Sequence, residues 1–315
     1  MISKGNVTKE VVEFKRYVGI CPVSIVTVNP NKKEHENIFN TTLEEEPIYV
    51  QDKEDMNGKS YKQVRISVIF KPETEIDTNY ITMPLFITNQ KVHGATSGKY
   101  QIVDKYGRFA WATEKEIQNK EIPTYSNGKK ADIDSDYRIA FVGEESLTNF
   151  IRTFLCIPNI SVWDNESRTM IPNTKVKKEE CECRLDTEDL EQIFKGNFKG
   201  IKEILGYQPT NKMKVCLGVR TDFATGKMYQ TVYTRRFFSS NTKSFNSLQK
   251  DINAENQYAN EHGRTINTEY SILPVHEYKV QATNLEQNNV AASTQVQEDD
   301  LPFNTPSSDE VMPWD

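Results

Sequence analysis

The feature that most constrains the fold is a pair of alternating segments late in the chain, residues 214–220 and 227–238. In the first segment, Val215, Leu217 and Val219 alternate with other side chains, which is the two-residue period of a strand with one buried face. The second segment is rich in β-branched and aromatic residues and follows a short polar stretch that suits a turn. Together the two segments predict an antiparallel β-ribbon.

Similar short strands are predicted throughout the first half of the chain. They fall at residues 17–28, with a kink at Pro22, at 47–51, 61–70 and 80–88, and in a hairpin over 99–111. Helices are predicted at residues 33–40, 146–155, 186–205 and 245–262, and the third of these has breaks at Gly196 and Gly200. A polar loop is predicted at 113–136. Consecutive strands with polar turns favour a sandwich or barrel over a parallel sheet. The expected class is therefore β-rich α+β, with helical insertions around 144–157 and 186–205.

Composition limits the functional classes. The chain has 315 residues, of which 37% are hydrophobic and 27% charged, and its mean hydropathy is −0.66. No apolar run approaches the roughly 20 residues that cross a bilayer, and no signal-peptide core follows Met1, so a cytoplasmic protein is expected. The common nucleotide-binding and hydrolase motifs are absent and only four histidines occur, so an enzyme is not expected. Asp132 and Asp134 have the chemistry of an Mg²⁺ site, but solvated loop acids explain them more simply.

The cysteines do not predict a cofactor. There are five, at positions 21, 156, 181, 183 and 216, an odd number that suits free thiols in a reducing compartment. Cys181 and Cys183 form a C-x-C pair without a second pair at zinc-finger spacing. We therefore expect no metal and no cofactor.

Two segments interleave rings with cations in the manner of single-strand-binding surfaces, where bases stack on aromatic side chains and cations follow the phosphates. The alternative is that the rings form the buried side of each ribbon. The candidate residues are Lys99, Tyr100, Lys105, Tyr106, Arg108, Phe109 and Trp111 in the hairpin, and Arg220, Lys227, Tyr229, Tyr233, Arg235, Arg236 and Phe237 in the late ribbon.

The acidity of the chain is concentrated in its last residues. The whole chain holds 39 basic and 45 acidic residues, a net charge of −6. After Lys279 there is no Lys or Arg but there are seven acids, at 286, 298, 299, 300, 309, 310 and 315, so the body holds 39 basic against 38 acidic residues. The tail, residues 283–315, is otherwise rich in Gln, Asn, Ser and Thr, which predicts disorder beyond a folded body at 1–282.

The tail contains one formula twice, in which acids are followed by an apolar residue, Pro and an aromatic ring. The first copy is Asp299, Asp300, Leu301, Pro302 and Phe303, and the second ends in Met312, Pro313 and Trp314. The first copy resembles the acidic tip of bacterial and phage single-stranded DNA-binding proteins. In that family the aromatic residue is usually the last one, whereas Phe303 lies twelve residues inside the chain. The resemblance implies an OB-type barrel and a tip that recruits replication and repair enzymes.

These observations predict a non-enzymatic protein, of bacteriophage or other viral origin, that binds single-stranded DNA in replication, recombination or repair. Polymerase, primase or helicase are the expected partners of the tail, and no membrane is expected to be a partner. Two alternatives stay open at this point. One is a recombinational strand-annealing protein, and the other is a host-interaction protein with no nucleic-acid role.

Overall fold

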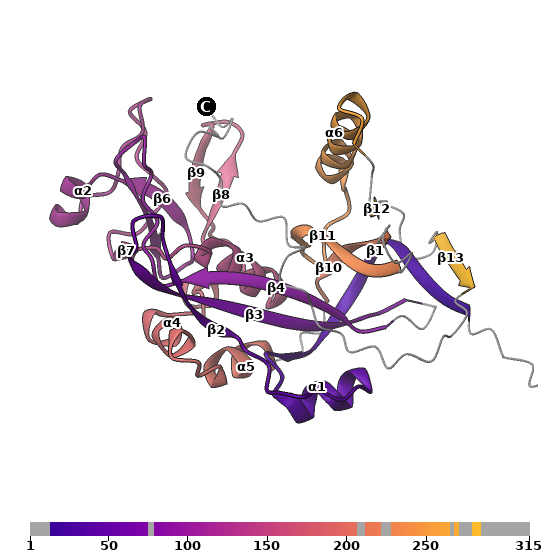
Figure 1. The fold of residues 1–315 in the computed structure, drawn as a ribbon. Helices are drawn as coiled ribbons and strands as arrows, with labels where there is room; N and C mark the ends of the chain where they lie inside the picture. Colours follow the sequence, from indigo (N-terminus) through magenta and orange to yellow (C-terminus); the bar gives the residue numbers. More distant parts are fainter. Residues whose placement is uncertain are drawn as a thin grey trace, which may run out of the picture. The chain divides into compact units, whose positions relative to one another are not determined.

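The computed structural model describes residues 13–74, 79–206, 212–221, 228–264, 268–270 and 279–284. These residues form a β-rich structure with six α-helices, so the expected combination of strands and helices is confirmed (Figure 1). They divide into two compact units, which are described separately below.

The first unit contains the described residues of 1–26, 69–83 and 210–292. Its elements are most of β1 (Glu13–Val28), the end of β3 (Ser60–Pro72), the start of β4 (Ile81–Thr88), β10 (Lys214–Thr221), β11 (Met228–Phe238), α6 (Asn246–Glu261), β12 (Thr268–Tyr270) and β13 (Lys279–Asn284). Strand β10 is the centre of this unit. It pairs with β11 along one edge and with both β1 and β12 along the other, in each case antiparallel.

Besides its pairing with β3, strand β1 pairs with two other strands in succession. Its residues 19–22 pair with β10, and residues 13–18 pair with β13. The exchange falls at Gly19, whose φ of 142° lies in the region open to glycine, three residues before the predicted kink at Pro22. Strand β13 ends at Asn284, so the first two residues of the predicted tail, 283 and 284, pair with the sheet.

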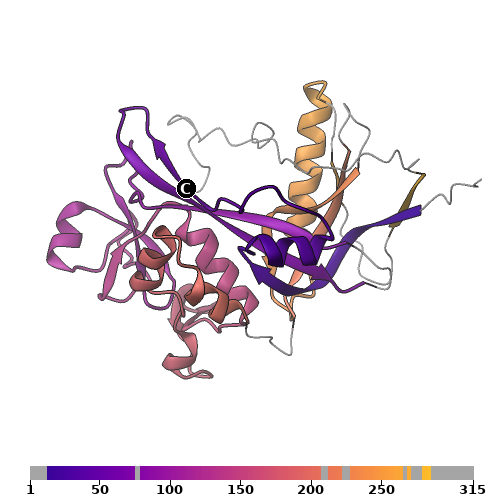
Figure 2. The same ribbon diagram turned by 60° about the horizontal axis from the view of Figure 1, so that its bottom comes forward.

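The second unit contains the described residues of 27–68 and 84–209. Its elements are α1 (Lys32–Phe39), β2 (Val50–Glu54), the remaining parts of β3 and β4, β5 (Tyr100–Asp104), β6 (Phe109–Ala112), α2 (Glu114–Asn119), β7 (Tyr137–Ile139), α3 (Glu144–Phe154), β8 (Ser161–Asp164), β9 (Thr169–Pro172), a 3₁₀ turn at Lys178–Cys181, α4 (Thr187–Phe194) and α5 (Lys199–Gly206). Figure 2 shows α4 and α5 beside α3. A three-stranded sheet in the order β6-β5-β7 and the separate β8–β9 hairpin belong to this unit.

The predicted loop at 113–136 requires a correction, because it contains α2 and part of a core. Thr113 and Glu116 form a capping box at the start of α2. The hydroxyl of Tyr137 donates to the carbonyl oxygens of Glu116 and Glu121, at 2.9 and 2.7 Å. Ala131 and Ile133 are buried against β5 and β6. A polar composition therefore concealed a packed segment.

Helix α3 also begins earlier than predicted. Its N-cap is Gly143, three residues before the predicted start at 146, with φ of 85°, and a Cβ at that position would collide with the carbonyl oxygen of Phe86. Only glycine fits this start. Leu147, Phe150, Ile151 and Phe154 are buried, as their helical spacing predicts.

Candidate nucleic-acid interface

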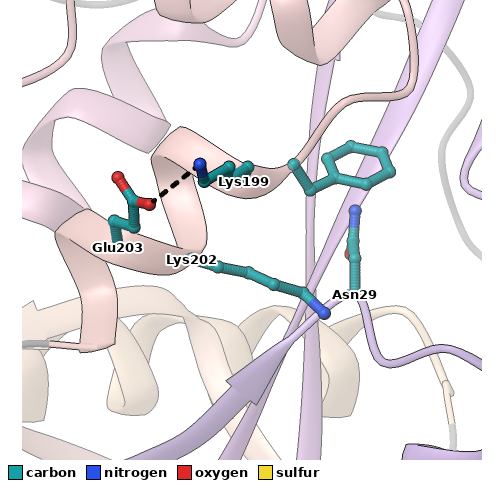
Figure 3. Close-up of a pocket in the computed structure, with 5 residues that line it drawn as sticks. Asn29, Lys199, Lys202 and Glu203 are labelled. Carbon is teal, nitrogen blue, oxygen red and sulfur yellow. Dashed lines mark ion pairs between the residues drawn. The ribbon is translucent and has the colours of Figure 1, made fainter.

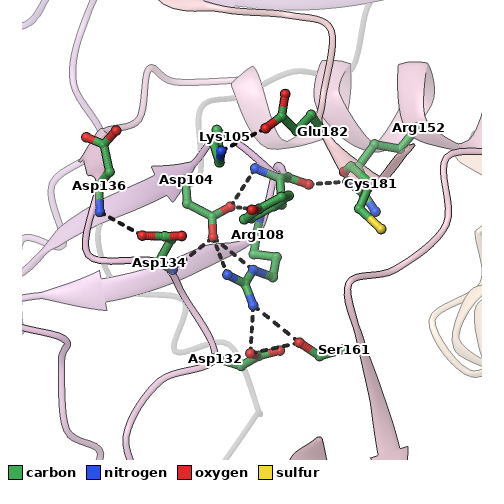
Figure 4. A network of polar contacts seen from close by, with 11 residues as sticks. Asp104, Lys105, Arg108, Asp132, Asp134, Asp136, Arg152, Ser161, Cys181 and Glu182 are labelled. Carbon is green, nitrogen blue, oxygen red and sulfur yellow. Dashed lines mark hydrogen bonds and ion pairs between the residues drawn. The ribbon is translucent and has the colours of Figure 1, made fainter. Parts of the chain in front are cut away.

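The turn between β5 and β6 is organised around the carboxylate of Asp104, whose side chain is fully buried. The backbone amides of Tyr106, Arg108 and Asp134 each donate to it at 3.0 Å. The guanidinium of Arg108 adds Nη2 at 2.6 Å and Nε at 2.8 Å (Figure 4). A buried carboxylate satisfied by so many donors is a structural anion.

Arg108 has further partners in the same network. Its Nη1 donates to Asp132 Oδ1 at 2.7 Å and to Ser161 Oγ at 3.3 Å, and the Ser161 hydroxyl donates to Asp132 at 3.0 Å. The structure thus places Arg108 between two carboxylates, where its charge is neutralised. Asp132, which the sequence suggested was a solvated loop acid, is one of these two partners.

The remaining residues of the turn are held in the same way. The ring of Tyr106 is buried, with the Lys105 ammonium and the Arg108 guanidinium 5.1 and 5.3 Å from its centroid. Arg152 of α3 donates to the carbonyl oxygen of Tyr106 and, at 3.1 Å, to that of Cys181. Lys105 is exposed and pairs with Glu182 at 2.7 Å, a hydrogen bond that raises the pKa of the ammonium group. One surface carboxylate therefore already competes for this ammonium group.

Trp111 is the most open ring of this hairpin, with 40% of its surface exposed. It lies opposite Gln101, whose side-chain amide donates to Glu145 at 2.7 Å, so its neighbourhood includes a carboxylate. Phe109, Tyr100 and Lys99 are half-buried, and the ring of Tyr100 lies 4.6 Å from that of His93. The hairpin therefore offers one exposed ring and little available positive charge.

The β10–β11 ribbon contains Tyr233 in its core. Its ring is 2% exposed and packs with Cys216 of β10 and with Leu248 and Ile252 of α6. Its hydroxyl donates to Glu255 Oε1 at 2.9 Å, and the Tyr270 ring meets it edge-on at 4.8 Å. Burial raises the pKa of Tyr270 to about 12, so the Tyr270 hydroxyl stays protonated at neutral pH. Figure 2 shows α6 alongside the two strands.

The opposite face of the ribbon is covered as well. Val215, Leu217 and Val219 are buried, and so is Tyr17 of β1. The side chain of Gln230 donates to the carbonyl oxygens of Tyr17 and Gly218, both at 2.7 Å, and accepts from the Tyr17 amide at 3.1 Å. This bridge satisfies backbone groups of two strands at once.

Tyr229 and Arg220 remain accessible at the distal end of the ribbon. They are cross-strand partners, Tyr229 is 46% exposed, and Arg220 is half-buried. Farther along β11, Arg236 pairs with Asp251 of α6, and Phe237 is half-buried. Lys227 and the side chain of Arg235 lie outside the described residues.

Two further exposed tyrosines in the first unit also have cationic neighbours, and the sequence reasoning did not select them. Lys71 Nζ lies 5.2 Å from the Tyr80 ring centroid. On α6, the Tyr258 ring stacks on that of His262 with centroids 4.0 Å apart, and Arg264 lies 5.2 Å from the same tyrosine. The four-residue spacing of Tyr258 and His262 on a predicted helix is the signal that identifies such a stack.

The β8–β9 hairpin exposes apolar side chains on both faces. Val162 pairs with Ile171 and Trp163 with Met170, and all four are 39–57% exposed. Exposed apolar clusters are in general typical of surfaces that contact other molecules.

The described residues contain no group of three or more metal-binding side chains, and no described helix is long and apolar enough to span a membrane. All five cysteines are free, as predicted, and Cys181 is buried while Cys183 is half-buried. Every tail residue of the predicted recruiting motifs, 299–303 and 312–314, lies outside the described residues.

Comparison with known proteins adds no relative: no family model matches the chain, and no curated protein or solved structure matches it either.

Proposed function

We propose that this protein binds single-stranded DNA without sequence preference, as a non-enzymatic component of viral DNA replication, recombination or repair. The observation that carries the proposal is the set of exposed tyrosines with adjacent cations in the first unit. Tyr229 lies across from Arg220, Tyr80 beside Lys71, and Tyr258 beside Arg264.

The chemistry of these pairs suits a single strand. An exposed ring stacks on a base of any sequence, a contact worth about 1–3 kcal/mol per base, while the neighbouring cation meets a phosphate. Our proposal assigns the first unit to an elaborated OB-type barrel, in which such rings would lie on the strand-binding face. The near balance of basic and acidic residues in the body, 39 against 38, favours this mode over strong binding of duplex DNA.

The acidic tail has two roles in this proposal. Its carboxylates compete with phosphates for the cations of the body, and its aromatic residues Phe303 and Trp314 enter a pocket on a replication enzyme such as a polymerase, primase or helicase.

A second candidate, a host-interaction protein, is favoured by the β8–β9 hairpin. Exposed Trp163 and Met170, together with Val162 and Ile171 on the other face, are side chains typical of the centre of a protein interface. This surface is compatible with a nucleic-acid role elsewhere in the chain.

The decisive experiment is a titration of labelled oligonucleotides followed by fluorescence anisotropy. A label on the DNA is needed because Trp111 and Trp163 belong to the second unit and Trp314 lies outside the described residues. We expect comparable binding of oligo-dT and oligo-dA, weaker binding of duplex and RNA, and an affinity that falls with salt as counterions are released. Duplex affinity equal to or above that of the single strands would refute the proposal.

Ending the chain after Asn284 tests both roles of the tail. The same titration measures DNA affinity, and a pull-down measures capture of a replication enzyme. This end point keeps β13, whereas a cut at Lys279 would remove its pairing with β1. The shortened chain is expected to bind oligo-dT more tightly, most clearly at low salt, and to capture no replication enzyme. Unchanged affinity and unchanged capture would leave the tail without either role.

A further inference from the structure

A hollow with a volume of about 440 Å³ lies in the second unit, where the end of β1 meets α5. Its lining residues are Asn29, Phe198, Lys199, Lys202 and Glu203 (Figure 3). The volume is within the range of small-molecule sites, roughly 300–1,000 Å³. None of these residues belongs to the tyrosine–cation pairs of the first unit.

Asn29 supplies a buried donor that lacks an acceptor. Its side chain is 4% exposed, and its Oδ1 accepts from the backbone amide of Ser67 at 2.6 Å. Because an amide N–H can only donate, this bond fixes the orientation of the Asn29 side chain and directs Nδ2 away from Ser67. Nδ2 is buried and has no hydrogen-bond partner in the part of the chain that the structure describes. A buried donor of this kind requires an acceptor.

The backbone holds Asn29 rigidly in this position. Its φ is 44°, in the left-handed region that asparagine tolerates, and its own amide donates to the Ser67 carbonyl oxygen at 2.9 Å. Two hydrogen bonds to one residue therefore fix both the backbone and the side chain, so the unpartnered nitrogen is preorganised.

Two lysines line the same hollow. The side chain of Lys202 extends toward Asn29, as Figure 3 shows, and its ammonium pairs with Glu34 at 3.1 Å. Lys199 pairs with Glu203 at 3.8 Å, and both of these side chains are largely exposed. Each ammonium group has three N–H donors, so one carboxylate contact leaves donors available. A long, exposed pair such as Lys199 with Glu203 is also readily displaced.

The remaining wall is aromatic. Phe198 meets the Tyr49 ring edge-on at 5.9 Å, and the guanidinium of Arg65 lies 5.6 Å from the Tyr49 ring. Lys199 and Lys202 are the two cations that line the hollow, and Glu203 is its one lining carboxylate. The hollow thus combines hydrogen-bond donors, two ammonium groups and an apolar ring.

We infer that this hollow binds the phosphate group of a nucleotide, with Asn29 Nδ2 and Lys202 Nζ donating to its oxygens and Phe198 contacting the attached sugar or base. The phosphate belongs either to a free nucleoside monophosphate or to a DNA strand. The inference goes beyond the proposed DNA binding, because that rests on the first unit.

Isothermal titration of the full chain with inorganic phosphate, dTMP and oligo-dT tests the site. We expect dTMP to bind more tightly than inorganic phosphate, since only dTMP reaches Phe198. Asn29→Asp keeps the acceptor for the Ser67 amide but replaces the free donor with a negatively charged oxygen, so dTMP affinity should fall by about tenfold or more. Lys202→Gln, on the half-exposed rim, should also weaken binding severalfold, and it provides a test if Asn29→Asp fails to fold.

Lys115→Gln is the matched control, because it removes the same charge from an exposed position on α2 and should leave dTMP affinity unchanged. Weaker oligo-dT binding by Asn29→Asp would assign the phosphate to a strand, and unchanged oligo-dT binding with weaker dTMP binding would assign it to a free nucleotide. Equal affinity of wild type, Asn29→Asp and Lys202→Gln for every probe would overturn the inference. Tyr229→Ala separates the two proposals, because dTMP binding in the hollow should not depend on it.

Discussion

In the β5–β6 hairpin a cation, Arg108, is held within the protein, whereas in the β10–β11 ribbon it is mainly a ring that is buried. Arg108 lies between Asp104 and Asp132, while its neighbour Trp111 stays open. In the ribbon, Tyr233 is buried under α6, while Tyr229 stays open opposite Arg220. Both segments have the same alternation of rings and cations.

The difference arises from partners that lie elsewhere in the sequence. Asp132 is 24 residues from Arg108, and Glu255 is 22 residues from Tyr233. Each partner holds one predicted DNA-binding side chain, Arg108 or Tyr233, in the interior, where that side chain stabilises the fold. What remains at the surface is a ring beside a carboxylate in the hairpin, and a ring beside a cation in the ribbon. Only the second combination suits a polyanion.

The largest expected effect separates the two tyrosines of β11. Tyr233→Ala should lower the free energy of unfolding by about 3–5 kcal/mol, because it leaves a cavity beneath α6. Tyr229→Ala, four residues away, should change it by less than about 0.5 kcal/mol, because the ring is half exposed. Urea unfolding followed by circular dichroism measures both. Similar losses from the two substitutions would show that the outer end of the ribbon is packed as well.

A smaller effect is expected at the turn of the hairpin. Arg108→Met removes the two guanidinium contacts of buried Asp104 but leaves its three backbone amide donors. Loss of one partner of a buried pair costs about 3–5 kcal/mol, and the remaining amides should reduce this to about 2–3 kcal/mol. Lys105→Met is the matched control on the same turn and should cost far less, because Lys105 is exposed. A stable Arg108→Met variant would mean that the arginine is available for phosphate.

Much of the fold follows from local patterns. Alternation and turn residues predict the pairing of β5 with β6 and of β10 with β11, and helical periodicity predicts α3. The helix expected within the polar stretch at 245–262 is present as α6. The predicted break at Gly196 falls between α4 and α5, whereas Gly200 lies within α5 and does not interrupt it. These elements are set by residues close in sequence, which is why a single chain is enough to predict them.

The elements that were missed depend on less regular information. Helix α2 is short and polar, and its capping box, Thr113 with Glu116, was the one available signal. Strand β13 is defined by its pairing with β1, more than 250 residues away, and not by its own composition. An alternating segment shows that a strand has two faces, but not which element covers each face. The burial of Tyr233 cannot be predicted from the strand alone for this reason, because it depends on α6 packing over that face.

The smallest expected effect concerns DNA affinity and compares the open ring of each region. Tyr229→Ala should weaken binding of labelled oligo-dT by about 1–3 kcal/mol, the value of one stacked base. Trp111→Ala should change it less than about twofold, because the neighbouring Gln101 donates to Glu145 and no cation of this turn is unpartnered among the described contacts. Tyr229→Phe keeps the ring and should keep the affinity. Anisotropy titrations at one fixed salt concentration give all three values. If Trp111→Ala weakens binding more than Tyr229→Ala, the DNA-binding surface belongs to the second unit. A cation beside the exposed ring would then not be what determines where DNA binds.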